Sequence, residues 1–580
     1  MKIAIAQLNP TIGDLAGNAR QILDAAQQAI AQDAALLLTT ELSLCGYPPR
    51  DLLMQPSFLE AMAGTLEQLA RDLPLQLAVL VGTVVPNENA AIAGGKPLFN
   101  STALLQHGQI QQYFHKRLLP TYDVFDEDRY FEPGTETNWF YLGDRTTGLK
   151  VGVTICEDLW NDEAFWGKRT YPTNPLIDLA AQGVDVIVNL SASPYSVGKQ
   201  AVREAMLRHS AANCQVPILY ANQVGGNDDL LFDGSSFGLN RQGNVVFRAR
   251  EFESDLTVVE FDKELGDVKP GAIAPAITQD DEEIWCALVM GVRDYVRKCG
   301  FSTVVLGLSG GIDSTLVAAI AAAAIGAENV LGVLMPSPYS SDHSITDALD
   351  LAKNLGIRTH TVPIQPMMEG FDQGLAPIFA GTEFGIAEEN LQSRIRGTLL
   401  MAISNKFGHL LITTGNKSEM AVGYCTLYGD MNGGLGAIAD VPKTRVYSLC
   451  RWLNEAMQFP NFALPDAFCL RAVATPVIPP HVISKPPSAE LKPGQVDQDS
   501  LPAYEILDDI LERFVERHES LADIIAAGHD AATVEKVVRL VTRAEFKRKQ
   551  APPGLKITDR AFGTGWRVPI ASRWLPTVRV

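Results

Sequence analysis

Short, continuous apolar runs recur through the first 265 residues, with amphipathic helical stretches such as residues 18–31 between some of them. Uninterrupted runs of this length are typical of strands that are covered on both faces. The pattern therefore predicts a layered α/β domain. The runs span residues 3–6, 36–38, 78–85, 151–155, 184–190 and 216–220.

A second series of strands and helices begins at Ser302. Apolar β-type segments alternate with helical ones, which implies a parallel, doubly wound sheet that binds ligands at the carboxyl ends of its strands. A helix over residues 504–517 is expected to pack by one apolar stripe. The expected strands are 303–308, 330–336, 360–364 and 410–415, with helices starting at Ser314 and near 346–355.

The segment 266–281 combines glycines and prolines and ends in acidic residues, which is typical of a linker leading into a helix. We expect one domain over residues 1–265, a linker over 266–282 and a second domain over 283–580. Two long loops, 425–443 and 476–502, are rich in glycine or proline and are interpreted as mobile lids.

Charge and cysteine spacing narrow the function classes. The net charge of -19 disfavours a general nucleic-acid binder. None of the eight cysteines falls in a Cys-x-x-Cys pair, which disfavours a zinc ribbon or a thioredoxin-like site. A chain of this length does not need disulfides to stabilise its core, so reduced thiols are predicted. The apolar run at the N-terminus is too short to be the hydrophobic region of a signal peptide. No apolar segment is long enough to span a membrane. A cytoplasmic protein with no membrane partner is expected.

The sequence SGGIDS at 309–314 lies between an expected strand and an expected helix. Adjacent glycines let the backbone approach an anion, and the N–H groups at the helix start can bind it. Asp313 would repel a bare phosphate, so Mg²⁺ on that phosphate is its expected partner. The loop lacks the lysine of a Walker A motif and resembles the pyrophosphate-binding loop of ATP pyrophosphatases.

Further segments make residues 283–580 resemble the NAD⁺ synthetases: EENLQSRIRG at 388–397, LITTGNKSE at 411–419, the glycine-rich loop from 428 to 444, and RAEFKRK at 543–549. The resemblance implies Mg²⁺ at Asp313 and Glu419, and deamido-NAD contacts at Asn390, Glu419 and Lys547. Arg394 and Arg396 fit surface ion pairs equally well and are not assigned to the site. The ATP contacts implied are Gly307, Leu308, Ser309, Gly310, Gly311, Ile312, Asp313, Ser314, Thr414 and Lys443.

In the first half, Glu41, Lys116 and Cys156 each follow a β-rich run, in the flanks LTTE, HKRLLP and VTICED. Together with NLSASPYSVGK this arrangement resembles the nitrilase (carbon–nitrogen hydrolase) superfamily, with its α-β-β-α sandwich. Cys156 needs a base to become a thiolate, which suits Glu41, and a developing oxyanion needs a cation, which suits Lys116.

The resemblance further implies glutamine contacts at Tyr122, Ser193 and Lys199, with Glu157 and Tyr47 as neighbours.

Taken together, the two resemblances imply glutamine-dependent amidation of deamido-NAD, with ATP cleaved to AMP and pyrophosphate, in a homo-oligomer. Three alternatives stay open from sequence. One is a tRNA-modifying ATP pyrophosphatase, which the acidic charge disfavours. Another is a nucleotide-sensing module that has lost catalysis, although the motifs show no damage. The third is a synthetase that uses ammonia directly.

Overall fold

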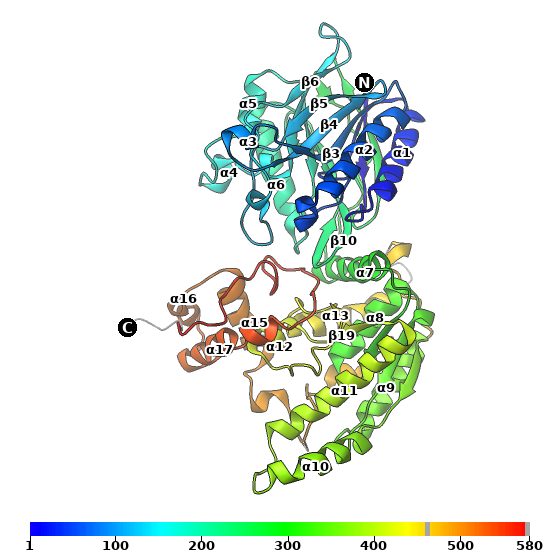
Figure 1. Cartoon of the computed structure of the whole chain (residues 1–580), viewed down its shortest axis with the longest axis vertical. Helices are drawn as coiled ribbons and strands as arrows, with labels where there is room; N and C mark the ends of the chain where they lie inside the picture. Colours follow the sequence, from blue (N-terminus) through cyan, green and yellow to red (C-terminus); the bar gives the residue numbers. More distant parts are fainter. Residues whose placement is uncertain (459–464, 493, 575–580) are drawn as a thin grey trace. The chain divides into compact units, whose positions relative to one another are not determined.

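The computed structural model describes residues 1–458, 465–492 and 494–574 (Figure 1). The chain divides into two compact units, Met1–Ile277 and Thr278–Val580. Each has its own sheets and its own hydrophobic core. No helix in the described ranges has the length and apolar character needed to cross a bilayer.

The first unit contains two sheets. One is seven-stranded, in the order β15-β14-β1-β2-β3-β4-β5, and the other is six-stranded, in the order β13-β12-β9-β8-β7-β6. The first sheet consists of β1 (Lys2–Gln7), β2 (Ala34–Leu38), β3 (Ala78–Pro86), β4 (Leu98–Gln106), β5 (Gln109–His115), β14 (Asp255–Asp262) and β15 (Asp267–Val268). The second consists of β6 (Trp139–Leu142), β7 (Leu149–Ile155), β8 (Val186–Ser191), β9 (Ile218–Asn222), β12 (Phe237–Leu239) and β13 (Val245–Arg248). A separate hairpin joins β10 (Val224–Asn227) to β11 (Leu230–Asp233).

The alternation of side chains along each strand produces the layers. Ile5 of β1 and Val153 of β7 belong to one core cluster, which therefore lies between the sheets. The next residue of β1, Ala6, packs in a different cluster with Ile22 of α1 (Leu15–Ile30) and with α2 (Pro56–Asp72). On the second sheet, α5 (Pro175–Ala181) and α6 (Lys199–Cys214) cover the outer face. The predicted α-β-β-α sandwich is confirmed.

The second unit has one five-stranded sheet whose strands are all parallel, in the order β18-β17-β16-β19-β20. Val305 packs with Ile395 of α11 (Ile386–Phe407) on one face, while α8 (Ile312–Ile325) and α9 (Asp342–Leu355) pack on β16, β17 and β18 from the other side. The predicted doubly wound sheet is confirmed. The strands are β16 (Val304–Gly307), β17 (Val330–Leu334), β18 (Arg358–Thr361), β19 (Leu410–Thr413) and β20 (Leu435–Gly436).

Helices connect and flank these strands (Figure 1). They are α7 (Asp280–Lys298), α8 (Ile312–Ile325), α9 (Asp342–Leu355), α10 (Gln365–Phe379), α11 (Ile386–Phe407), α12 (Lys417–Val422), α13 (Lys443–Ala456), α14 (Pro480–Ser484), α15 (Tyr504–Leu511), α16 (Leu521–Ala526), α17 (Ala531–Arg543) and α18 (Glu545–Arg548). The first unit also contains the short helices α3 (Ala90–Ala93) and α4 (Glu163–Trp166).

Several boundaries differ from those expected. Strand β18 ends at Thr361 rather than reaching residue 364, and Pro363 just beyond it has no N–H to donate to a ladder. The helix expected over 504–517 is α-helical only to Leu511 and continues as a π-helix, Glu512–Glu516. Its expected apolar stripe is nevertheless in the core, since Leu507, Ile510, Leu511 and Val515 are all buried.

Candidate active sites

The ammonium group of Lys116 lies between two carboxylates in the first unit. Its Nζ is 2.7 Å from Glu41 Oε1 and 2.8 Å from Glu127 Oε2, and its side chain is fully buried. Burial alone would lower the pKa of Lys116, but the charges of Glu127 and Glu41 raise it well above its usual value. A fixed positive charge is therefore held in a dry environment, where it acts most strongly on a developing anion.

Glu41, just beyond the end of β2, is held by three donors. Its Oε1 accepts from Lys116 and, at 2.8 Å, from Asn100 Nδ2, while its Oε2 accepts from the Ala192 backbone N–H at 3.1 Å. All three contacts use the carboxylate as an acceptor. The side chain is buried, so its position is fixed before any substrate arrives.

Cys156 lies at the sharp turn from β7 into the 3₁₀ helix Cys156–Leu159. Its φ of 43° is in the left-handed region, which residues with a side chain rarely adopt, and such strain clusters at functional sites. Burial and the charge of Glu41 raise the pKa of the thiol well above its usual value, while the charge of Lys116 lowers it. The thiol is therefore protonated in the free protein and needs a base at the moment of attack.

Asp158 connects the segment that follows Lys116 to the turn at Cys156. Its carboxylate accepts the N–H groups of Ile155, Arg117 and Leu118 at 3.0, 3.0 and 2.9 Å. Burial raises its pKa to about 6, although these backbone bonds oppose the shift. One side chain thus sets the relative positions of two elements that carry reactive groups.

Glu127, Asn100 and Asp158 were not predicted from the sequence. Glu127 lies in an acidic run and begins the 3₁₀ helix Glu127–Arg129, so its letters suggest a solvated surface. In the structure it is buried, contacts Lys116, and accepts a hydrogen bond of 2.9 Å from Tyr47 OH. Burial raises the pKa of Glu127 to about 7, with the Lys116 charge opposing.

The structure places Tyr122 beside Glu157, the residue that follows Cys156. The Tyr122 hydroxyl donates to Glu157 Oε2 at 3.0 Å, and the Tyr122 residue is about half exposed to solvent. The predicted glutamine contact and the predicted neighbour therefore meet directly next to the nucleophile candidate.

Ser193 and Lys199 lie at the two ends of the loop between β8 and α6. The backbone N–H of buried Ser193 donates to Asn222 Oδ1 at 3.0 Å. Lys199, the first residue of α6, donates to the Pro194 carbonyl at 2.7 Å, and its Nζ lies 5.7 Å from the centre of the Trp160 ring. The loop is thus closed by its own lysine.

The second unit contains a cavity of about 710 Å³, a size suited to a large nucleotide-like ligand. Its walls come from the SGGIDS loop, the TTGNKSE segment, α11 and residues 482–492 and 494–497 of the proline-rich segment. Of the predicted site residues of this unit, those that line it are Gly307, Leu308, Ser309, Gly311, Ile312, Asp313, Ser314, Asn390, Thr414, Glu419, Lys443 and Lys547.

Gly310 supports the loop from behind. Its φ is +76°, and a Cβ there would lie 2.1 Å from the backbone oxygen of Ser344, so only glycine fits. Ser309 Oγ accepts the Gly311 N–H at 3.1 Å and lies 3.1 Å from Ser314 Oγ. The loop thereby reaches the N-terminus of α8 in a fixed shape that suits phosphate binding.

Two carboxylates meet at Lys443 in this cavity. Lys443 Nζ lies 2.5 Å from Asp313 Oδ2 and 3.5 Å from Glu419 Oε1. Burial and then the charge of Asp313 raise the pKa of Glu419 to about 8, with the Lys443 ammonium opposing. Paired carboxylates next to a phosphate loop are the donor set that Mg²⁺ prefers together with phosphate oxygens, so these residues fit the predicted cation.

Four consecutive residues at the start of α12 contact several different segments of the chain. Asn416 binds the phosphate loop, Lys417 the π-helix and the segment near residue 558, Ser418 helix α15, and Glu419 faces the start of α13. The partner side chains are Asp313, Glu516, Thr558, Asp508 and Lys443.

Asn390 and Lys547 approach one segment, residues 423–426, from different helices. Asn390 Oδ1 accepts from Thr426 Oγ1 at 2.9 Å, and Lys547 Nζ donates to the carbonyls of Gly423 and Cys425, each at 2.7 Å. The far-separated sequence segments are therefore brought to one wall of the cavity.

Arg396 also lines the cavity, although it was left out of the predicted site. Its Nε donates to the Met335 carbonyl at 3.0 Å, and burial lowers its pKa to about 10. Arg394 donates instead to the Leu427 carbonyl at 3.2 Å and is not among the lining residues. The periodicity of α11 could have separated these two arginines, because they are two residues apart and point to different sides.

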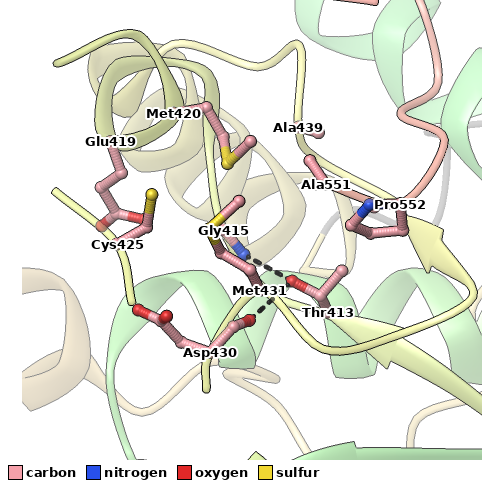
Figure 2. Close-up of a pocket in the computed structure, with 11 residues that line it drawn as sticks. Thr413, Gly415, Glu419, Met420, Cys425, Asp430, Met431, Ala439, Ala551 and Pro552 are labelled. Atoms are coloured by element: carbon pink, nitrogen blue, oxygen red, sulfur yellow. Dashed lines mark hydrogen bonds between the residues drawn. The ribbon is translucent and has the colours of Figure 1, made fainter. Parts of the chain in front are cut away.

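A much smaller cavity, of about 20 Å³, lies against the same strand end (Figure 2). Figure 2 shows Glu419, Cys425 and Asp430 along one side and Pro552 along the other. Thr413 Oγ1 donates to the Asp430 carbonyl at 3.1 Å, and burial raises the pKa of the Asp430 carboxyl to about 6. The space suits one molecule of the size of water.

Comparisons with known proteins agree with this division of chemistry. Residues 2–270 match the carbon–nitrogen hydrolase family, and residues 284–551 match the NAD synthase family. A glutamine-dependent NAD(+) synthetase from Synechocystis is 59% identical over 574 residues, covering 99% of each chain. The chain belongs to the glutamine-dependent NAD⁺ synthetases. A second such synthetase, from Thermotoga maritima, is 43% identical over 607 residues and also covers 99% of each chain.

Solved structures support the same assignment. The glutamine-dependent NAD⁺ synthetase from Acinetobacter baumannii, solved in complex with ADP, is 41% identical, with a TM-score of 0.75 and 99% of each chain covered. Glutamine-dependent NAD⁺ synthetases are ligases that amidate deamido-NAD with nitrogen from glutamine, using ATP, and their nitrilase-like domain hydrolyses glutamine at a cysteine. Membership in this family excludes the tRNA-modifying alternative that the sequence left open.

Proposed function

We propose that Cys156 is the nucleophile of the glutaminase, with Glu41 as its base and Lys116 as the cation that stabilises the oxyanion. The observation that carries this proposal is the buried Lys116 ammonium, held between Glu41 and Glu127 and acting electrostatically on the Cys156 thiol. Covalent amide hydrolysis needs a nucleophile, a base and a cation close together. Here these groups come from separate strand ends into one buried cluster.

The steps follow from these groups. The Cys156 sulfur bonds to the amide carbon of glutamine while its proton passes to Glu41. The tetrahedral oxyanion forms beside Lys116. Glu41 then returns the proton to the leaving nitrogen, the carbon–nitrogen bond breaks, and ammonia departs. Water, deprotonated by Glu41, hydrolyses the thioester to glutamate and restores the thiol.

Tyr122, Ser193 and Lys199 are proposed to bind the amino-acid end of glutamine. Ser193 and Lys199 are supported by their closed loop beside β8, and Tyr122 by its contact with Glu157. Lys199 supplies the positive charge that the α-carboxylate of glutamine requires.

In the second unit we place both nucleotides in the cavity of about 710 Å³. The loop 307–314 with Thr414 and Lys443 would bind ATP, and Asn390, Glu419 and Lys547 would bind deamido-NAD. The nicotinate carboxylate attacks the α-phosphorus of ATP, pyrophosphate leaves, and ammonia then displaces AMP from the adenylate. The N–H groups at the start of α8 hold the departing phosphates.

Asp313 and Glu419 would hold Mg²⁺ with ATP, and a bound Mg²⁺ neutralises phosphate charge. Lys443, which contacts both carboxylates, keeps them together before the cation arrives.

We further propose a cytoplasmic homo-oligomer, built from a glutaminase domain (1–265), a linker (266–282) and a synthetase domain (283–580). Eight free cysteines support a reducing compartment. The family matches at 2–270 and 284–551 support the division. Light scattering of the purified protein measures the number of copies, and a monomer would contradict the oligomer.

The decisive assay measures NAD⁺ from deamido-NAD and Mg·ATP with either glutamine or ammonium, in the unmodified protein and in Cys156→Ala. Loss of only the glutamine route in the variant is the expected result. Cys45→Ala is the matched control, because Cys45 is also buried in the first unit. Glutamine-driven synthesis by Cys156→Ala at the unmodified rate would sink the proposal.

A further inference from the structure

Glu157 is a buried carboxylate beside the nucleophile, and two tyrosines from separate loops donate to it. Tyr122 OH lies 3.0 Å from its Oε2, and Tyr171 OH lies 2.9 Å from its Oε1. Tyr122 OH also lies 3.3 Å from Oε1, so Oε1 contacts both phenols and Oε2 contacts Tyr122. Two fixed donors leave the carboxylate one orientation, while its remaining lone pairs can accept further hydrogens.

The side chain of Asn161 makes four hydrogen bonds with the loop that carries Tyr171. Asn161 Nδ2 donates to the carbonyls of Tyr171 and Thr173 at 3.0 and 2.6 Å, and Asn161 Oδ1 accepts the N–H groups of Thr170 and Tyr171 at 3.2 and 3.1 Å. Asn161 itself is buried, five residues beyond Cys156. The hydrogen bonds to buried Asn161 therefore fix the position of the loop where Tyr171 contacts Glu157.

The charges at this point suit a cationic group. The direct donors to Glu157 are neutral phenols, which fix the carboxylate without cancelling its charge. Burial raises the pKa of Glu157, whereas Lys116 and then the hydrogen bonds of Tyr171 and Tyr122 lower it. A buried carboxylate next to Cys156, with phenols as its direct donors, is a counterpart for the α-ammonium group that distinguishes glutamine from simpler amides.

We propose that Tyr171 is a positioning residue for substrate selectivity: it holds Glu157 so that the carboxylate receives the α-ammonium group of glutamine. This inference rests on the proposed Cys156 glutaminase. A site that bonds a substrate cation rejects an analogue without it, because its own buried charge is then left unpaired.

The test compares hydrolysis of glutamine and of glutaramate, which is glutamine without its α-amino group, by ammonia release from the full chain. For Tyr171→Phe we expect kcat/KM for glutamine to fall about tenfold, as for a lost hydrogen bond to a charged group. The value for glutaramate should change less than about twofold, since no α-ammonium is bound. The matched control is Tyr130→Phe, whose hydroxyl donates to the surface carboxylate of Asp51 at 2.6 Å.

A second readout is the pH profile. Losing the Tyr171 hydrogen bond raises the pKa of Glu157, so the acidic limb of the glutamine profile should move to higher pH in Tyr171→Phe. The glutaramate profile should not move. Asn161→Ala, which frees the loop, should also reduce selectivity, and adding Tyr171→Phe to it should reduce selectivity no further.

Equal losses with both substrates would mean that Tyr171 only shapes the pocket, and would overturn the inference. Unchanged selectivity in Tyr171→Phe, or an unmodified protein that does not prefer glutamine, would overturn it as well. In each of these cases Cys156→Ala would still abolish hydrolysis of both amides, so the glutaminase proposal would stand. Hydrolysis that survives Cys156→Ala would instead refute the glutaminase itself.

Discussion

Asp158→Asn is expected to damage the glutaminase without touching a group that contacts the substrate. The aspartate accepts three backbone N–H groups, one on the Cys156 side and two directly after Lys116. Asparagine has nearly the same shape but only one oxygen. If the asparagine oxygen still accepts the N–H groups of Arg117 and Leu118, the asparagine NH₂ group faces the Ile155 N–H. Two hydrogen-bond donors then point at each other.

The magnitude follows from that exchange. A hydrogen bond to a charged group contributes about 1.5–3 kcal/mol, and a buried donor left unpaired costs about 1–3 kcal/mol. We expect the free energy of unfolding of the first unit to fall by about 2–4 kcal/mol. The turn at Cys156 should also shift relative to Lys116, and a misplacement of about 1 Å can reduce kcat about 10²-fold.

The assay compares NAD⁺ formation with glutamine and with ammonium as the nitrogen donor. Glutamine-driven NAD⁺ formation should fall about 10²-fold in Asp158→Asn, while ammonium-driven formation stays unchanged, since the nucleotide cavity belongs to the other unit. Asp178→Asn is the matched control, because Asp178 contacts the side chain of Arg117 and is partly exposed. A glutamine-dependent kcat equal to that of the unmodified protein in Asp158→Asn would refute the reasoning.

Three further variants test other parts of the structure. Gly310→Ala should abolish NAD⁺ formation with either donor and leave glutamine hydrolysis intact, since its Cβ would lie 2.1 Å from the Ser344 oxygen; retained synthesis would contradict the fit of the loop. Burial and then the charge of Asp313 raise the pKa of Glu419 to about 8, so protonation of this carboxyl competes with a cation below that pH. Binding of Mg·ATP there should release a proton and tighten as pH rises through 8; calorimetry in two buffers measures the release, and Glu419→Gln should remove it. Arg203→Met leaves buried Asp233 unpaired and should lower the unfolding free energy of the first unit by about 3–5 kcal/mol in urea, whereas an unchanged midpoint would argue against a buried ion pair.

Local patterns predicted a layered α/β domain in the first half and a doubly wound parallel sheet in the second, whereas the α-β-β-α sandwich was implied by the nitrilase resemblance. The SGGIDS sequence follows β16 as predicted, but α8 begins within it at Ile312, two residues before the predicted start at Ser314. Such features depend on neighbours in the chain, which a reader of the sequence can see. The start of α1 shows the ordinary error, because Asp14 caps the helix and begins it at Leu15, before the predicted residue 18.

Contacts between distant segments were not predictable in the same way. Glu127 reads as part of a charged surface run, yet the fold buries it against Lys116 and Tyr47. From the sequence, Arg396 fitted a surface ion pair equally well, yet it lines the cavity of about 710 Å³. Helical periodicity can separate Arg396 from Arg394, but it does not show what covers either face. For Glu127, burial depends on which distant segments of the chain pack over the side chain, and local spacing does not encode that.

The start of α12 has a consequence for how this region can change. Residues 416–419 contact several separate segments through adjacent side chains. Each residue of an α-helix turns the direction of its side chain by about 100°. A single residue inserted or deleted between Asn416 and Glu419 would therefore change the directions of these side chains relative to one another, and no single compensating substitution could restore their contacts. The segment can accept replacements one side chain at a time, but its length is fixed.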